Sequence, residues 1–111
     1  MINIKVSRSE NGSVCGFSVK GHSGYAESGS DIICAAVSAL CYTAAGYFDE
    51  AGLYGIRTEF EEGEGYMKLE VVSEDRGENM IRAETVMEAW LTGIKQIRES
   101  YGGKYLRIRD L

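Results

Sequence analysis

Two pairs of segments with alternating apolar and polar residues constrain the fold of this chain most strongly. Apolar side chains recur at every second position in segments 2–6, 14–20, 56–60 and 67–71. This is the spacing of half-buried strands. Asn11-Gly12 separates the first pair and a glycine-rich tetrapeptide the second, and such residues favour tight turns. We therefore predict two antiparallel hairpins, with Cys15, Phe17 and Val19 on a core-facing side of the first.

Each predicted hairpin is followed by a segment with helical character. Residues 32–48 are apolar on nearly all sides, which predicts a central, buried helix. Ser30 or Asp31 is suited to cap its start. Between positions 80 and 101, apolar residues recur at spacings of three and four, which predicts an amphipathic helix with Trp90 in the core. A coiled-coil seam is the alternative use of this stripe.

A short alternating segment at 106–109 completes the order ββαββαβ. Two helices packed on one face of a mostly antiparallel five-stranded sheet would bury the apolar side of every element. The sequence thus predicts an α+β fold, and 111 residues are the size of a single domain spanning residues 1–111.

Composition narrows the range of partners. The net charge of −5 argues against a generic nucleic-acid binder, which needs clustered Lys and Arg. No stretch approaches the roughly 20 apolar residues of a membrane span, and the N-terminus lacks a signal-peptide pattern. We therefore expect a cytoplasmic protein with no membrane and no nucleic-acid partner.

The number and spacing of the cysteine and histidine residues limit the kinds of site that this chain can form. Three cysteines without a Cys-x-x-Cys pair, together with one histidine, argue against a disulfide framework and a structural zinc site. Reduced thiols fit best. We expect neither a metal nor a cofactor.

The stretch from 21 to 40 holds the residues best suited to catalysis. A Gly/Ser-rich loop separates His22, the only histidine, from Cys34. If a helix starts near Asp31, Cys34 lies in its first turn, where free N–H groups favour a thiolate. Those N–H groups can also stabilise an oxyanion, and His22 can serve as the base. The alternative is a structural cysteine with a surface histidine.

Three further residues share the helical stripe of Cys34, namely Asp31, Ser38 and Cys41. Asp31 either orients His22 as a triad acid or simply complements the helix dipole. Ser38 either bonds the thiol or the histidine, or bonds back to a carbonyl one turn earlier. Cys41 is expected to pack in the core.

These residues resemble the ribosomal-processing cysteine protease (Prp) family. The matching pattern is Gly21-His22, a Gly/Ser-rich loop and the Asp-Ile-Ile-Cys-Ala-Ala-Val-Ser run at 31–38, and the resemblance covers essentially the whole chain. It implies that Cys34 is the nucleophile and His22 the general base. Asp31, Ser38 and Gly21 match supporting positions around the dyad.

The resemblance also implies a substrate and an assembly. Family members are expected to be cytoplasmic, homodimeric proteases that remove a short N-terminal extension from ribosomal large-subunit protein twenty-seven. The extension ends in aromatic residues followed by alanine, which implies an apolar substrate pocket.

Loop 21–30 is then expected to close over the substrate. Besides Gly21 and His22, its expected substrate-facing members are Ser23, Gly24, Tyr25, Gly29 and Ser30. Ser23 stands where the family often has alanine. Two alternatives to the protease stay open: a non-catalytic ribosome-associated binding module, which needs a basic surface, and a redox-responsive thiol protein.

Overall fold

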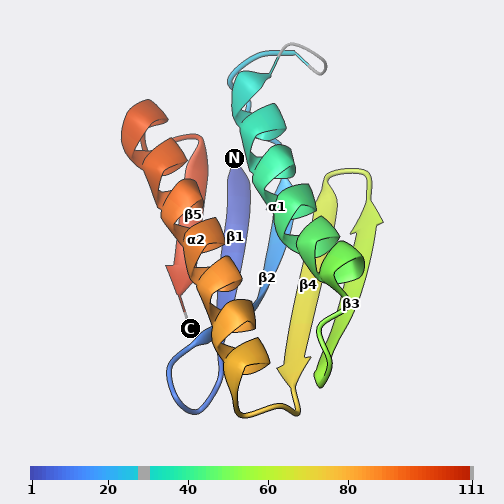
Figure 1. Ribbon diagram of the computed structural model, residues 1–111. Helices are drawn as coiled ribbons and strands as arrows, with labels where there is room; N and C mark the ends of the chain where they lie inside the picture. Colours follow the sequence, from blue (N-terminus) through green and yellow to red (C-terminus); the bar gives the residue numbers. More distant parts are fainter. Residues whose placement is uncertain (28–30, 111) are drawn as a thin grey trace.

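The computed structural model describes residues 1–27 and 31–110, and it has the predicted order ββαββαβ. In chain order the elements are β1 (Ile2–Arg8), β2 (Val14–Gly21), α1 (Ile32–Ala51), β3 (Ile56–Gly63), β4 (Tyr66–Ser73), α2 (Glu78–Tyr101) and β5 (Leu106–Asp110). Both helices lie side by side on one face of the sheet and run in opposite directions (Figure 1). The predicted two-layer α+β fold is confirmed.

The five strands form one mixed sheet in the order β3-β4-β2-β1-β5. The three pairs among β1 to β4 are antiparallel, whereas β5 returns beside β1 in parallel. A parallel neighbour needs a crossover connection, and α2 provides it. The sheet is therefore mostly antiparallel, as predicted, with its one parallel pair at the β5 edge.

The core fills the space between the sheet and the helices. Trp90 of α2 is 3% exposed and stacks on Phe17 of β2, with ring centroids 4.2 Å apart and planes 11° from parallel. Around this pair lie the apolar side chains of β1, which are also buried. The prediction that Trp90 belongs to the core is confirmed.

The prediction for Cys15 is wrong, because β2 contains an irregularity. Ser7 pairs with Gly16 while Arg8 pairs with Val14, so Cys15 is an extra residue opposite β1. A bulge of this kind breaks the alternation of side chains. Val14 takes the buried position, and Cys15 is only half-buried.

The prediction that α1 is buried nearly all round is also wrong. Its buried side chains lie on one face: Ile33, Val37, Cys41, Ala44 and Phe48. Ile32 and Tyr42 on other faces are half exposed. The small alanines made the segment look uniformly apolar, but they cost little when left in water.

The same helix corrects a second expectation. α1 is 20 residues long and apolar enough to cross a membrane by length and composition, although no such stretch was expected. In the structure its buried face packs against the sheet and α2.

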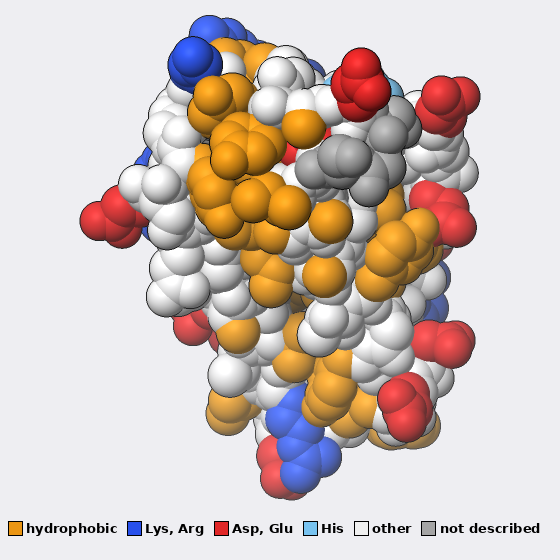
Figure 2. Space-filling model, turned by 90° about the horizontal axis from the view of Figure 1, so that it is seen from above, with side chains coloured by type: hydrophobic (Ala, Val, Ile, Leu, Met, Phe, Trp, Pro, Cys, Tyr) orange, Lys and Arg blue, Asp and Glu red, His pale blue; other side chains and the backbone are white. Residues whose placement is uncertain are grey.

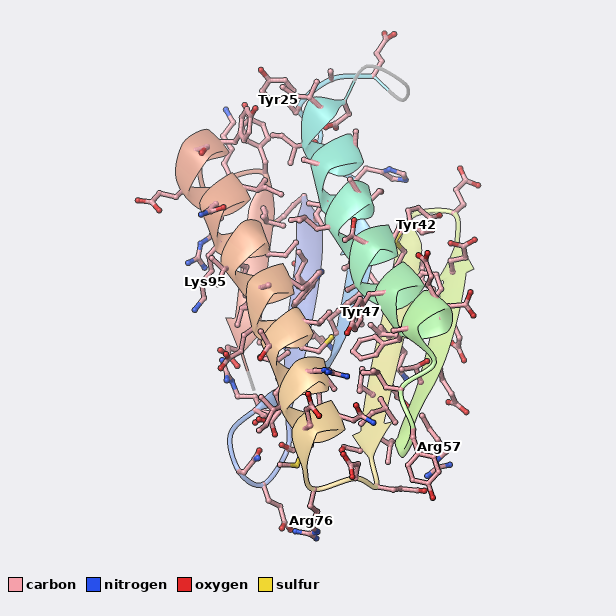
Figure 3. The ribbon with its side chains drawn as sticks, in the orientation of Figure 1. Tyr25, Tyr42, Tyr47, Arg57, Arg76 and Lys95 are labelled. Atoms are coloured by element: carbon pink, nitrogen blue, oxygen red, sulfur yellow. The ribbon has the colours of Figure 1, made fainter. Side chains whose placement is uncertain are left out.

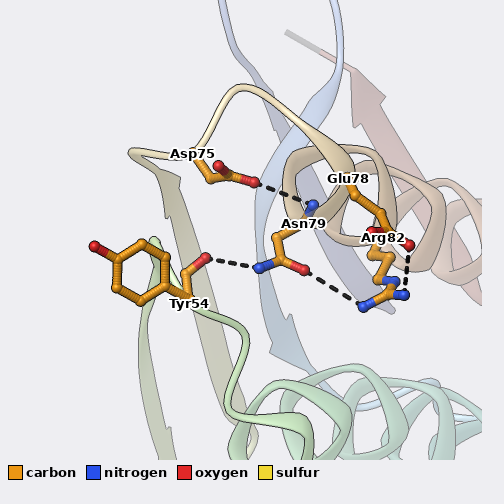
Figure 4. A network of polar contacts seen from close by, with 5 residues as sticks. All are labelled: Tyr54, Asp75, Glu78, Asn79 and Arg82. Atoms are coloured by element: carbon orange, nitrogen blue, oxygen red, sulfur yellow. Dashed lines mark hydrogen bonds and ion pairs between the residues drawn. The ribbon is translucent and has the colours of Figure 1, made fainter.

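Polar contacts join the connections at one end of the fold (Figure 4). Asn79, in the first turn of α2, donates its side-chain amide to the Tyr54 carbonyl at 3.0 Å and its backbone N–H to Asp75 at 3.1 Å. Arg82, one turn further along α2, forms an ion pair with Glu78. The start of α1, the end of β2 and the β3–β4 turn meet at the opposite end (Figure 1).

Candidate active site

Asp31 begins helix α1 and lies at the centre of the site. Its Oδ1 accepts hydrogen bonds from the backbone N–H groups of Ile33 and Cys34, both at 3.0 Å. The residue has an extended backbone and is 9% exposed. These are the features of an N-cap, so the expectation that Ser30 or Asp31 caps this helix is met by Asp31.

Ser23 connects the loop before α1 to both Asp31 and Cys34. Its hydroxyl donates to Asp31 Oδ2, and its backbone N–H donates to Cys34 Sγ at 3.3 Å. The same hydroxyl accepts the N–H of Tyr25 at 3.0 Å. Burial opposes the charged form of Asp31, but the hydrogen bonds from Ser23, Cys34 and Ile33 outweigh it and hold the pKa of Asp31 below its usual value.

A cleft of about 230 Å³ brings the predicted catalytic residues together. Cys34 and Ser38 line it from α1, His22 from the loop, and Gly65 and Tyr66 from the β3–β4 hairpin. Figure 2 looks onto this end of the molecule, where hydrophobic and acidic side chains lie close together. The predicted pair of Cys34 and His22 thus shares one cleft.

The His22 and Cys34 side chains share this cleft but differ in exposure. Among residues 1–27 and 31–110, no hydrogen bond joins the His22 imidazole to Cys34. The His22 side chain is exposed, whereas Cys34 is half-buried. Hydrogen bonds between catalytic groups are often loose before substrate binds.

Two glycines determine where His22 lies. Gly21 donates its N–H to the Gly65 carbonyl at 2.9 Å. Gly21 has φ +95°, and a Cβ there would lie 2.5 Å from the Met1 carbonyl oxygen. At Gly65, with φ +65°, a Cβ would lie 3.0 Å from His22 Nε2. Gly65 was not among the predicted site residues, and its only signal in the sequence is the Gly-Glu-Gly turn at 63–65.

The remaining predicted residues fall into three groups. Ser38 lines the cleft one turn after Cys34 and, within the described part of the chain, makes no side-chain hydrogen bond. Gly24 has φ +74° in the loop. Gly29 and Ser30 lie outside the described residues.

Tyr25 fixes the other side of the loop. Its ring meets Tyr101 and Tyr105 edge-on, with centroids 5.9 and 5.3 Å apart. Figure 3 shows it between the start of α1 and the end of α2.

The expectation that free N–H groups of the first turn serve the thiolate or an oxyanion is wrong for Ile33 and Cys34. The Asp31 carboxylate occupies both, and the Asp31 carbonyl accepts the N–H of Ala35 at 3.1 Å. A negative cap also offsets the positive end of the helix dipole. Among the described contacts of Asp31, none reaches His22, so the geometry favours the capping role over the triad role.

A second cavity lacks the combination of a thiol and an imidazole. It is larger, about 400 Å³, and is lined by Ser9, Cys15 and Met80 among others. It contains a thiol but no histidine. Within residues 1–27 and 31–110, no group of three or more His, Cys, Asp or Glu side chains is placed to hold a metal ion.

The smaller cleft thus contains both a thiol and an imidazole among its lining side chains. Residues 1–106 match the family model of cysteine protease Prp. The chain belongs to the Prp family of cysteine proteases. As a Prp family member it is a hydrolase of the cysteine protease type.

Similar proteins agree with this assignment. The ribosomal processing cysteine protease Prp of Bacillus subtilis (strain 168) is 25% identical over 101 residues, which cover 91% of this chain and 90% of that protein. The Prp protease of S. aureus, solved with a covalently linked product peptide, is 23% identical over the full length of both chains with a TM-score of 0.83. A Streptococcus mutans protein is 26% identical, with a TM-score of 0.76, over 100% of this chain and 94% of that one. The shared fold thus extends over the whole Prp chain.

Proposed function

We propose that this Prp family member cleaves peptide bonds with Cys34 as the nucleophile and His22 as the general base. One observation carries the proposal: Cys34 Sγ accepts a backbone N–H inside the cleft that it shares with the only histidine. Neither of the other two cysteines has this setting, since Cys41 is fully buried and Cys15 is remote from His22.

The chemistry follows the order usual for a thiol nucleophile. Sγ attacks the scissile carbonyl carbon, and the thiol proton passes to the His22 imidazole. The tetrahedral intermediate collapses as the leaving amine takes that proton, which leaves a thioester on Cys34. Water then attacks the thioester carbonyl while His22 accepts its proton. The C–S bond breaks, the acid product leaves, and His22 returns the proton to Sγ, which restores the free thiol.

The His22 side chain must approach Sγ for this sequence to run. It is exposed, and Gly65 leaves room for its ring beside the hairpin. We propose that a peptide in the cleft shifts the part of the loop that carries His22 so that the imidazole reaches Cys34, a gating step common in enzymes.

The substrate that we propose is the precursor of ribosomal large-subunit protein twenty-seven, cut at the end of its N-terminal extension. Support comes from the ribosomal processing activity in the name of the Bacillus subtilis relative and from the S. aureus structure with a substrate peptide. The cleft offers apolar surface from Val19, Val37 and Met67, which suits aromatic residues of the extension.

We further propose that the protein works as a homodimer in the cytoplasm, without a nucleic-acid or membrane partner. The net charge of −5 disfavours direct binding to RNA phosphates. Sedimentation at micromolar concentration tests the dimer, and a single species of monomer mass would contradict it.

Cleavage of a peptide that spans the extension and the mature start tests the activity. We expect the parent and the control Cys15→Ala to cut at the junction. Cys34→Ala and His22→Ala should lose at least about a thousandfold in kcat/KM. Parental cleavage by Cys34→Ala would overturn the assignment of the nucleophile.

A further inference from the structure

We propose that Ser23 is a positioning residue whose hydroxyl holds the loop before α1 in place, so that the Ser23 backbone N–H stays hydrogen-bonded to Cys34 Sγ. This inference rests on the proposed role of Cys34. Ser23 is 3% exposed although it lies in a surface loop, and a buried hydroxyl needs partners. Its partners are the cap of α1 and the loop itself.

The contacts form a closed ring through the start of α1. The Ser23 hydroxyl donates to one oxygen of Asp31, and the other oxygen accepts the Cys34 N–H at 3.0 Å. The ring closes where the Ser23 N–H donates to Cys34 Sγ at 3.3 Å. The hydroxyl and the N–H of one residue thus hold the carboxylate and the sulfur at the same time.

The hydroxyl also orders the loop beyond Ser23. It accepts the N–H of Tyr25 at 3.0 Å, directly after Gly24, whose φ of +74° turns the chain. The Tyr25 ring packs against Tyr101 and Tyr105 at the far side. Without the hydroxyl, the loop would keep the aromatic contact but lose its attachment beside the sulfur.

The contact to sulfur is the one that matters for reactivity. A backbone N–H bonds a thiolate more strongly than a thiol, because the bond is then charge-assisted. The Ser23 N–H is therefore placed to stabilise the charge on the sulfur as it attacks, as long as the hydroxyl holds the loop in place. Alanine at position 23 would keep the N–H but not the bond that places it.

Alkylation of Cys34 by iodoacetamide tests the inference without any substrate. We expect Ser23→Ala to slow alkylation about three- to tenfold at neutral pH, the effect of one hydrogen bond of ordinary strength. Mass spectrometry of the Cys34 peptide separates this reaction from that of Cys15. Ser100→Ala, an exposed serine at the end of α2, is the matched control and should react like the parent.

A double variant shows whether the hydroxyl acts through Asp31. Added to Asp31→Ala, the Ser23→Ala change should slow alkylation less than about twofold, because the ring is already open. Equal slowing in both backgrounds would overturn the inference, as would a parental rate in Ser23→Ala itself. Thermal unfolding of each variant verifies that it is folded.

Peptide cleavage separates this inference from the proposed function. In Ser23→Ala we expect kcat to fall by a similar factor while KM stays within about twofold, since the substrate cleft is intact. If the parent failed to cleave the peptide, the proposed function would be wrong, yet the alkylation result would still decide the role of Ser23.

Discussion

Replacing Asp31 by alanine is the sharpest stability test of the account. The change removes the helix cap, which is worth about 1 kcal/mol. It also leaves the buried Ser23 hydroxyl and the Cys34 N–H without their acceptor, and a buried unpaired polar group costs about 1–3 kcal/mol. We therefore expect Asp31→Ala to lower the free energy of unfolding by about 2–4 kcal/mol near neutral pH.

The pH dependence of this loss identifies the carboxylate as its source. The pKa of Asp31 is lowered in the folded state, so its contribution is complete above the unfolded value of about 3.9. It disappears as pH falls through the lower folded value. The difference in unfolding free energy between parent and Asp31→Ala should therefore shrink in strong acid.

Urea unfolding followed by circular dichroism measures both effects. Asp49→Ala is the control, because Asp49 is an exposed carboxylate near the other end of α1 and should change the free energy of unfolding by less than about 0.5 kcal/mol. The reasoning is refuted if Asp31→Ala behaves like this control. It is also refuted if its deficit stays constant from neutral pH to about pH 2.

Three other predictions follow from the packing. Trp90→Ala should cost about 3–5 kcal/mol in urea unfolding, and near-parental stability would contradict its stacking on Phe17. Gly65→Ala should lower kcat/KM more than about tenfold by displacing His22, yet cost only about 1 kcal/mol of stability; unchanged cleavage would contradict this role. Burial raises the pKa of the Cys41 thiol to about 11, so native protein should take up no iodoacetamide at Cys41, and labelling there at the rate of free cysteine would be contrary evidence.

Local patterns were sufficient to predict the elements of this fold. Strand alternation and helical spacing depend on neighbouring residues alone, so the order ββαββαβ and the burial of Trp90 could be predicted. The position of β5 beside β1 could not, since it depends on a crossover of the whole chain. The irregularity at Cys15 was hidden for a related reason, because a bulge exists only relative to the partner strand.

The residues of the candidate site also differ in whether local sequence was sufficient to predict them. The positions of Cys34 at a helix start and His22 in the preceding loop could be predicted from spacing, and the family resemblance strengthened them. The contacts of Ser23 could not be predicted, because they need the loop to fold back on α1. Gly65 lies more than forty residues from His22 in the chain, so only the docked hairpin shows that it leaves room for the imidazole.

Covalent trapping tests the central claim most directly. A peptide chloromethyl ketone that carries the last residues of the extension should inactivate the protein by forming one bond to Cys34 Sγ with loss of chloride. Peptide mapping of the inactivated protein should find the adduct on Cys34 alone, and His22→Ala should form it much more slowly. An adduct on Cys15, or inactivation that leaves Cys34 unmodified, would contradict the account.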